Sequence, residues 1–382
     1  MQDMCNVLET CEEKGTIRTQ EMNINYGPQH PSTHGVYRAV LTLEGEYITK
    51  CVNHLGYLHR GMEKLAESRT YTQFIPYNGR LDYLAGMLCE ESYVRAVEKL
   101  MGITDQIPER AEYIRVIMSE LQRIASHLVF YASIALDMAG FTPWTYGFRE
   151  RDTILDLIEM TAGNRMMPNY MRIGGVAADL PDEFMPALRK LLDIMPKCID
   201  EYHGILTGNE IFQARTKRVA PLSAEKVLDY GLTGPNARAS GVDFDLRRDE
   251  PYGIYDRFKF NVPTRQTGDS FDRYIVRMEE IVESVKIIEQ AMKDIPEGPI
   301  IAKVPKLIKP PVGETYSRIE HSKGHLGFYL VSDGSPKPYR THIYSPSFVN
   351  VAVFEEMAVG LHLQDAVVAF ASLDIVLGEI DR

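Results

Sequence analysis

The stretch ERAEYIRVIMSELQRIASHLVFYASIALDMA, residues 109–139, decides the fold class of this chain. Apolar side chains recur in it at helical spacing, at Ile114, Ile117, Leu121, Ile124 and Leu128. At about 1.5 Å per residue, a helix of this length spans roughly 45 Å. The sequence therefore predicts a long helix whose apolar stripe packs into a helical bundle.

The same stretch places Glu120, Arg123 and His127 together on another face, at spacings of three and four residues. Two interpretations stay open: a solvated face with helix salt bridges, or a buried face whose charges need partners elsewhere. Asp137 follows in the apolar context ALDMAGF. It is either a local hydrogen-bonding group near a helix end or a carboxylate with a distant partner.

Outward from this helix, the pattern predicts an α+β fold. Further helices are expected at 80–101, 149–163, 182–206 and 269–295. Residues 21–54 alternate like a small antiparallel sheet, which buries one face of the run 36–43. From residue 313 the pattern is again β, with two strands around Lys323-Gly324 and another near 339–343, followed by two short helices. The expected architecture is a central bundle of long helices with small antiparallel sheet regions at the N- and C-terminal ends.

We divide the chain accordingly. Residues 1–20 are expected to be an N-terminal extension, and 21–60 a β-sheet region. Residues 61–300 form the helical bundle core, interrupted by an irregular segment at 207–268 that is rich in Gly, Pro and Arg. Residues 301–382 form a C-terminal α+β region.

Composition excludes several functional classes. The net charge of −11 argues against a nucleic-acid binder, which usually carries a basic face. No apolar run reaches the roughly 18–20 residues that span a bilayer, and no signal-peptide pattern occurs, which favours a cytosolic chain. Nucleotide-binding glycine motifs are missing from the sequence. The five cysteines are scattered without a CxxC pair, so we expect no disulfide framework and no metal or cluster site.

The motif GPQHPSTHGV, residues 27–36, carries two histidines on a tight turn, because its prolines and glycines forbid a regular helix. His30 and His34 can donate hydrogen bonds, bind metal or carry protons there, or they can simply be solvated. Tyr83 lies in NGRLDYL, just inside the helix predicted to start near Arg80. A tyrosine at a helix start is ordinarily a packing residue.

Together, the motifs of this chain resemble one known family. GPQHPSTHGV, LGYLHRGMEK, RLDYL, RVIMSELQRIASH, FRERD and MRIGGVAADLP occur in this order, and LGEIDR ends the chain. They are similar to the family of the 49 kDa subunit of respiratory complex I, which is NADH–quinone oxidoreductase. The resemblance covers about residues 21–382 and implies a fold like that of the related [NiFe] hydrogenase large subunits.

The relation to hydrogenases can be tested on the residues. Counting back from RAVE, Arg95–Glu98, places RLDYLA on the hydrogenase motif RICGIC, so that Asp82 and Ala85 stand at cysteine positions. In SLDIVLGEIDR, Val376 and Glu379 replace the other two cysteines. These four side chains cannot replace the thiolates that hold nickel and iron. We therefore expect no metal and exclude hydrogenase activity.

In the family, the remodelled cavity receives a quinone headgroup. The resemblance implies that His34 and Tyr83 hydrogen-bond the two quinone carbonyls and that Asp137 is the carboxylate partner of His34. It further implies that Val376 and Asp381 line the cavity. Reducing a quinone takes two electrons and two protons, so a donor at each oxygen can stabilise developing charge and deliver a proton.

Three further residues have less direct candidate roles. His30 is a candidate accessory of the quinone site, or a brace of its own turn. Arg60 resembles an arginine near the terminal [4Fe–4S] cluster of a neighbouring small subunit. Met167 stands where many relatives carry a histidine that tunes this cluster, so we expect a cluster potential with little pH dependence from this source.

The resemblance also implies partners and a location. The chain itself binds no cofactor; quinone is the substrate, and NAD acts elsewhere in the complex. Expected partners are the small cluster-bearing subunit, a 30 kDa-type subunit and the membrane subunit at the quinone entry. The location is the peripheral arm, on the cytoplasmic side of the membrane, of a proton-pumping complex fed by NAD(P)H or ferredoxin. A non-catalytic scaffold is the alternative interpretation.

Overall fold

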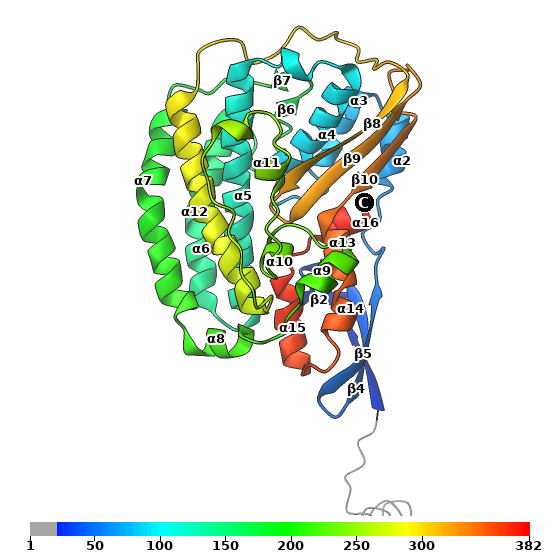
Figure 1. Ribbon diagram of the computed structural model, residues 1–382, viewed down its shortest axis with the longest axis vertical. Helices are drawn as coiled ribbons and strands as arrows, with labels where there is room; N and C mark the ends of the chain where they lie inside the picture. The colour runs from blue at the N-terminus through cyan, green and yellow to red at the C-terminus, as the bar shows by residue number, and fades with distance from the viewer. Residues whose placement is uncertain (1–20) are drawn as a thin grey trace, which may run out of the picture.

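The structure, a computed structural model, describes residues 21–382; the predicted extension at 1–20 lies outside the described residues. Its centre is a bundle of long helices that lie side by side (Figure 1). They are α5 (Glu109–Asp137), α6 (Phe141–Ala162), α7 (Phe184–Tyr202) and α12 (Ser270–Asp294). Helix α4 (Gly86–Met101) packs between α5 and a sheet. The predicted bundle is confirmed.

Small antiparallel sheets flank the bundle at both ends of the described chain, as predicted. The first has the order β1-β4-β5, from Glu21–Tyr26, Arg38–Glu44 and Tyr47–His54. The second has the order β10-β9-β8, from Arg340–Tyr344, Gly324–Ser332 and Gly313–His321. Two-stranded pairs join β2 (Gln29–His30) to β3 (Gly35–Val36), and β6 (Met171–Arg172) to β7 (Gly175–Val176). In the first sheet, Ala39, Leu41 and Leu43 alternate into the core.

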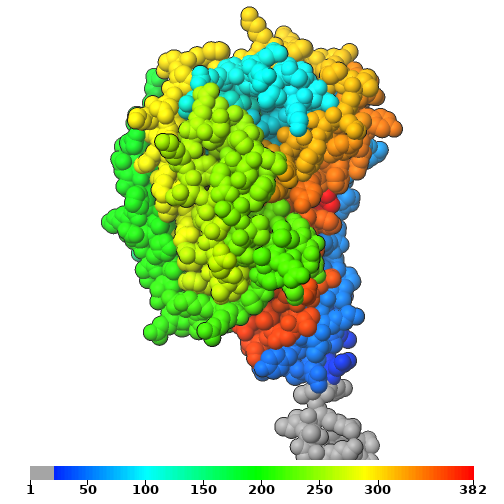
Figure 2. Space-filling model, in the orientation of Figure 1, coloured from blue at the N-terminus to red at the C-terminus, as the bar shows by residue number. Residues whose placement is uncertain are grey.

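Short helices complete the fold. Helix α2 (Met62–Ser68) packs against β10 of the second sheet, and α3 (Tyr71–Asn78) packs against α4. The irregular segment 207–268 contains α8 (Glu210–Thr216), α9 (Ala224–Tyr230), α10 (Pro235–Arg238) and α11 (Leu246–Asp249). Figure 2 shows this segment, in green to yellow-green, spread over one face of the molecule. The C-terminal region contains α13 (Pro346–Ala352), α14 (Phe354–Met357), α15 (Leu363–Ser372) and α16 (Leu377–Asp381).

The polar face of α5 is buried, which decides between the two interpretations left open by the sequence. The carboxylate of Glu120 contacts Arg247 at 3.1 Å and accepts from the Ser284 hydroxyl at 2.6 Å. His127 Nε2 lies 2.9 Å from a carboxylate oxygen of Glu280. These groups belong to a set of buried, mutually paired charges that we call the scaffold network: Glu120, Arg238, Arg247, Glu280 and Glu320.

The helix predicted from Arg80 begins later, at Gly86, so this boundary was wrong. Residues 79–85 form a turn instead. In it, Oδ1 of Asp82 accepts the Leu84 amide hydrogen at 2.9 Å, and the Ala85 amide donates to the Asp82 carbonyl. Aspartate side chains often compete with the helix in this way by bonding the backbone locally. Tyr83 therefore lies in the turn before α4, not inside the helix.

Over residues 21–382, none of the helices combines the length and the apolar character that crossing a bilayer requires.

Candidate functional site

A cavity of about 380 Å³ brings together four of the residues singled out from the sequence: His34, Tyr83, Asp137 and Val376. Its walls come from the turn before β3, the turn before α4, the C-terminal half of α5, the start of α6 and the segment before α16. They are lined by Pro31, Ser32, His34, Tyr83, Leu84, Val129, Ser133, Leu136, Asp137, Trp144, Asp374, Ile375 and Val376. The lining is largely apolar with a few polar groups, as in typical sites for small organic molecules.

His34 and Asp137 form one polar pair of the cavity. Nε2 of His34 lies 2.8 Å from Oδ2 of Asp137, the last residue of α5. The His34 side chain is 19 % exposed and that of Asp137 is 7 % exposed, so the pair is screened from bulk water but reachable from the cavity. A carboxylate at this distance fixes the orientation of the ring and compensates the charge of a protonated imidazole.

The turn that presents His34 is shaped by its neighbours. Residues 31–33 form one turn of 3₁₀ helix, and the His34 amide donates to the Pro31 carbonyl at 3.3 Å. The Thr33 hydroxyl contacts the carbonyls of His30 and Gly35 at 2.6 and 2.8 Å. Gly35 has a φ of +139°, and a β-carbon there would lie 2.8 Å from a Leu377 methyl. The turn therefore packs directly against α16.

Tyr83 approaches the cavity from the turn before α4. Burial, and next the carboxylate of Asp82, raise the pKa of its phenol, although the cations Lys323 and Arg60 act in the opposite direction. The hydroxyl is thus a neutral hydrogen-bond donor at physiological pH. The cavity has two proton-bearing groups, on different wall segments.

Next to Tyr83 lies a group of buried ionisable side chains that we call the cavity cluster: Asp82, Lys323, Asp374 and Glu379. The Lys323 ammonium lies 3.2 Å from Asp82 Oδ2 and 3.7 Å from Asp374 Oδ2. Burial, and next the charge of Asp82, raise the pKa of Glu379 to about 8. At neutral pH this carboxyl group is therefore mostly protonated.

The four positions matched to hydrogenase cysteines lie on two adjoining segments. A β-carbon added to Gly378 would lie 2.6 Å from the Leu81 carbonyl oxygen, so the two segments meet at backbone distance. Asp82, Ala85 and Glu379 are fully buried there, and Val376 lines the cavity. Within residues 21–382 no three histidine, cysteine or acidic side chains are grouped as metal ligands.

Four predicted site residues are not among those that line this cavity. His30 is exposed, and its Nδ1 accepts the Ser32 amide hydrogen at 3.2 Å, which braces the turn. Arg60 donates to the carbonyls of Arg80 and Gly378 and thereby links the two segments described above. The other two are Asp381 and Met167.

Of these two, Asp381 binds the amides of Gly56 and Leu58 at 2.8 and 2.7 Å and lines a separate cavity of about 390 Å³. Met167 has a φ of +53°, and its Cα lies 3.7 Å from the position that a β-carbon on Gly79 would take. It therefore packs beside the turn that bears Tyr83.

Lys323, Asp374 and Trp144 were missed by the sequence analysis. Lys323-Gly324 has the pattern of a hairpin turn, which hides a buried lysine. Asp374 stands inside the motif SLDIVLGEIDR, and Trp144 is the single tryptophan of the chain. The motif around Asp374 and the uniqueness of Trp144 are the sequence signals that could have identified these two residues.

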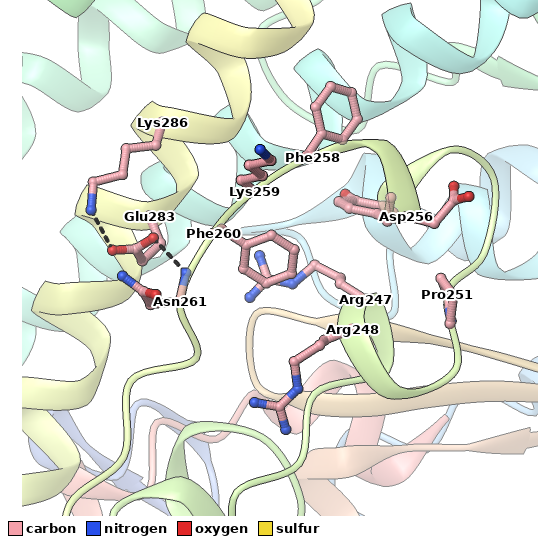
Figure 3. A pocket seen from close by; sticks show the side chains of 11 residues that line it. Arg247, Arg248, Pro251, Asp256, Phe258, Lys259, Phe260, Asn261, Glu283 and Lys286 are labelled. Atoms are coloured by element: carbon pink, nitrogen blue, oxygen red, sulfur yellow. Dashed lines mark hydrogen bonds and ion pairs between the residues drawn. The ribbon is translucent and has the colours of Figure 1, made fainter.

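A larger cavity, of about 540 Å³, lies elsewhere, between the segment 247–261 and α12 (Figure 3). Several of its charged and polar groups are engaged with neighbouring groups. Lys286 contacts Glu283 at 2.6 Å, the other Glu283 oxygen accepts the Asn261 amide, and Arg248 pairs with Asp249 at 2.9 Å. Because Arg247, Arg248 and Lys286 already have carboxylate partners, this groove is a weaker candidate than the cavity at His34 and Tyr83.

Known proteins resemble the chain over nearly its whole length. The family described as "Respiratory-chain NADH dehydrogenase, 49 Kd subunit" matches residues 137–311 and 304–382. A protein from Clostridium beijerinckii, named as the D-type subunit of NADH-quinone oxidoreductase, is 64% identical over 96% of this chain and 98% of its own length. Proteins of the same name from Desulforamulus reducens and Carboxydothermus hydrogenoformans are 59% and 57% identical, each over 96% of this chain and 100% of their own length.

Proposed function

Since this chain belongs to the family of the 49 kDa subunit of respiratory-chain NADH dehydrogenase, we propose that it forms the chamber in which NADH-quinone oxidoreductase reduces quinone. The single observation that carries the proposal is the convergence of the His34–Asp137 pair and Tyr83 on one cavity. Apolar residues such as Leu84 and Ile375 line the same cavity and suit an aromatic headgroup.

The chemistry requires a proton at each quinone oxygen. In its protonated form, the His34 imidazole donates Nε2–H to Asp137 and has Nδ1–H free for one carbonyl. The Tyr83 hydroxyl donates to the other. As two electrons arrive, both donors stabilise the negative charge that develops on the oxygens, and both protons transfer to give quinol. Neutral histidine and tyrosinate remain, and they recover their protons before the next turnover.

The electrons come from outside this chain. We propose that they arrive from a [4Fe–4S] cluster of a neighbouring small subunit, near Arg60 and Met167. A thioether at Met167 cannot titrate, so this position adds no pH dependence to the cluster potential. A 30 kDa-type subunit and a membrane subunit at the quinone entry are the other proposed neighbours. NADH is the proposed donor, as in the name of the relatives, and proton pumping is the proposed coupled process.

In this proposal the chain sits in the peripheral arm of the complex, on the cytoplasmic side of the membrane. The proposed site draws on all three parts of the sequence division. These are the sheet region at 21–60, the helical core at 61–300 and the C-terminal region at 301–382. His34, Tyr83 and Val376 each come from a different one.

The test is substitution in the assembled complex. For Tyr83→Phe and His34→Ala, we expect quinone reduction to fall about 10²-fold or more, the range for loss of a positioned proton donor. Complex content and NADH oxidation by a hydrophilic acceptor that takes electrons upstream should stay near wild type. Tyr339→Phe is the matched control, since Tyr339 is exposed and lies outside the cavity lining.

A scaffold that only docks its neighbours would tolerate both substitutions. Wild-type turnover with a short-chain quinone in the His34 and Tyr83 variants would therefore refute the catalytic roles. Stoichiometric nickel in the purified complex would instead revive the hydrogenase interpretation.

A further inference from the structure

Lys323 is a fully buried lysine in the turn between β8 and β9. Its ammonium lies 2.9 Å from the Ser126 hydroxyl, 3.2 Å from Asp82 Oδ2 and 3.7 Å from Asp374 Oδ2. A lysine ammonium has three hydrogens to donate, and here three oxygens surround it. Fully buried lysines are rare unless paired, so this arrangement requires an explanation.

The two carboxylates belong to the two segments that form adjacent walls of the cavity. Asp82 directly precedes Tyr83 in the turn before α4, and Asp374 lies two residues before Val376. Tyr83, Asp374 and Val376 all line the cavity. The Lys323 ammonium is therefore placed behind the cavity, where it contacts both wall segments at once.

The segment around Asp374 is held in a conformation that needs support. Asp374 has a φ of +53°, which side-chain-bearing residues seldom adopt. Arg277 donates to the carbonyls of Ser372 and Leu373 at 3.1 and 3.2 Å, and its Nε lies 3.4 Å from Asp374 Oδ2. Arg277 and Lys323 thus hold the Asp374 segment by its backbone and its carboxylate.

The charges around Lys323 make it a permanent cation. Burial alone lowers the pKa of its ammonium, but the carboxylates of Asp374 and Asp82 outweigh burial and hold the pKa above its ordinary value. Burial lowers the pKa of His321 to about 3, so this neighbour is neutral. Glu379, mostly protonated at neutral pH, adds little charge. Asp82 and Asp374 are therefore the charged partners that Lys323 binds.

We propose that Lys323 is a positioning residue of the quinone site, whose ammonium ties the turn bearing Tyr83 to the segment Asp374–Val376. One buried cation thus sets the distance between two walls that are far apart in the sequence. The inference rests on the proposed function, because the walls matter only if quinone binds between them. Lys323 does not line the cavity and touches no substrate; it acts through Asp82 and Asp374.

The test compares variants of Lys323 in the assembled complex. Lys323→Met keeps an unbranched side chain but removes the charge, so we expect the KM for a short-chain quinone to rise about tenfold or more and kcat to fall. Lys323→Arg keeps the charge and should restore part of both. Because Lys323→Met leaves the buried Asp82 without its cation and can fail to assemble, the double variant Lys323→Met/Asp82→Asn is measured beside it. Lacking the tie, the double variant should remain impaired.

The matched control is Arg115→Met. Arg115 is also a fully buried cation, bound to Glu98 at 2.6 Å and Glu112 at 3.2 Å, but it lies outside the cavity lining. In its assembled fraction, KM and kcat should match wild type. Wild-type kinetics in Lys323→Met, or full recovery in the double variant, would overturn the inference. If Tyr83→Phe also kept its turnover, the proposed function itself would fail; loss in Tyr83→Phe alone would leave that function standing.

Discussion

The scaffold network and the cavity cluster are two buried sets of charge in one chain, and they differ in how completely their oxygens are bonded. In the scaffold network, both carboxylate oxygens of Glu120, Glu280 and Glu320 have hydrogen-bonding partners. In the cavity cluster, one oxygen each of Asp82, Asp374 and Glu379 lacks a well-formed hydrogen bond, although each is buried. For the two aspartates, Lys323 supplies an ion pair instead.

The difference separates structural from functional charge. Buried polar groups are nearly always hydrogen-bonded, because an unmade bond costs free energy. A saturated network such as that around Glu280 fixes neighbouring elements and has no capacity left for a ligand. The cavity cluster retains acceptor capacity beside the proposed quinone site, and such exceptions are expected at functional positions.

The largest loss of stability is expected for a substitution in the scaffold network. Glu280→Ala removes the partner of His127 and Arg238 and leaves a buried guanidinium with fewer countercharges. Loss of one member of a buried ion pair costs about 3–5 kcal/mol. We expect little assembled complex and a clearly lowered melting temperature. An unchanged thermal transition would show that this network is not structural.

A smaller effect on stability and a selective effect on activity are expected at the cavity. Asp137→Asn leaves the His34 ring a neutral partner in place of a carboxylate, so the imidazolium loses its countercharge. Quinone turnover should fall about 10²-fold, near the lower end for general acid–base groups. The melting temperature should move little, because the pair is partly exposed. A variant that lost stability and activity in parallel would contradict the distinction between the structural scaffold network and the residues of the cavity.

The smallest loss is expected for Glu379→Gln, which mimics the protonated acid. The folded-state pKa of Glu379, about 8, lies above the ordinary value of 4.5, so the folded chain binds the extra proton between these values. Wild-type stability from this group is therefore full below about pH 4.5 and declines as pH rises to 8. The amide cannot ionise.

Melting curves of the complex at pH 5, 7 and 9 provide the measurement for Glu379. The variant should gain on wild type as pH rises, by an amount on the order of a few kcal/mol. Glu289→Gln, at an exposed position of α12, is the control and should follow wild type. Parallel curves for wild type and Glu379→Gln would place the ionisation of this residue in its ordinary range.

Much of the architecture could be predicted from the sequence, because helical and strand periodicities are local properties. The start of α4 was missed because the Asp82 side chain bonds the Leu84 amide, a competition that hydrophobic periodicity does not display. The burial of Glu120 and His127 stayed undecided for a related reason. Their partners lie on α12 and the segment 236–247, and only the tertiary structure shows that these cover α5.

The candidate site was predictable only in part. The resemblance to a family selected His34, Tyr83, Asp137 and Val376, and the structure gathers these four around one cavity. Lys323 escaped because its sequence context is that of an ordinary turn. Its partners Asp82 and Asp374 are distant in the chain, so no local spacing reveals them.

The walls of the cavity are drawn from residues 31–34, 83–84, 129–144 and 374–376, which together span most of the described chain. During synthesis, the first three segments emerge from the ribosome long before the last. Contacts between such distant segments form late, since chain entropy opposes their closure. A nascent or truncated chain therefore lacks this cavity, and the proposed quinone site arises only once folding is complete.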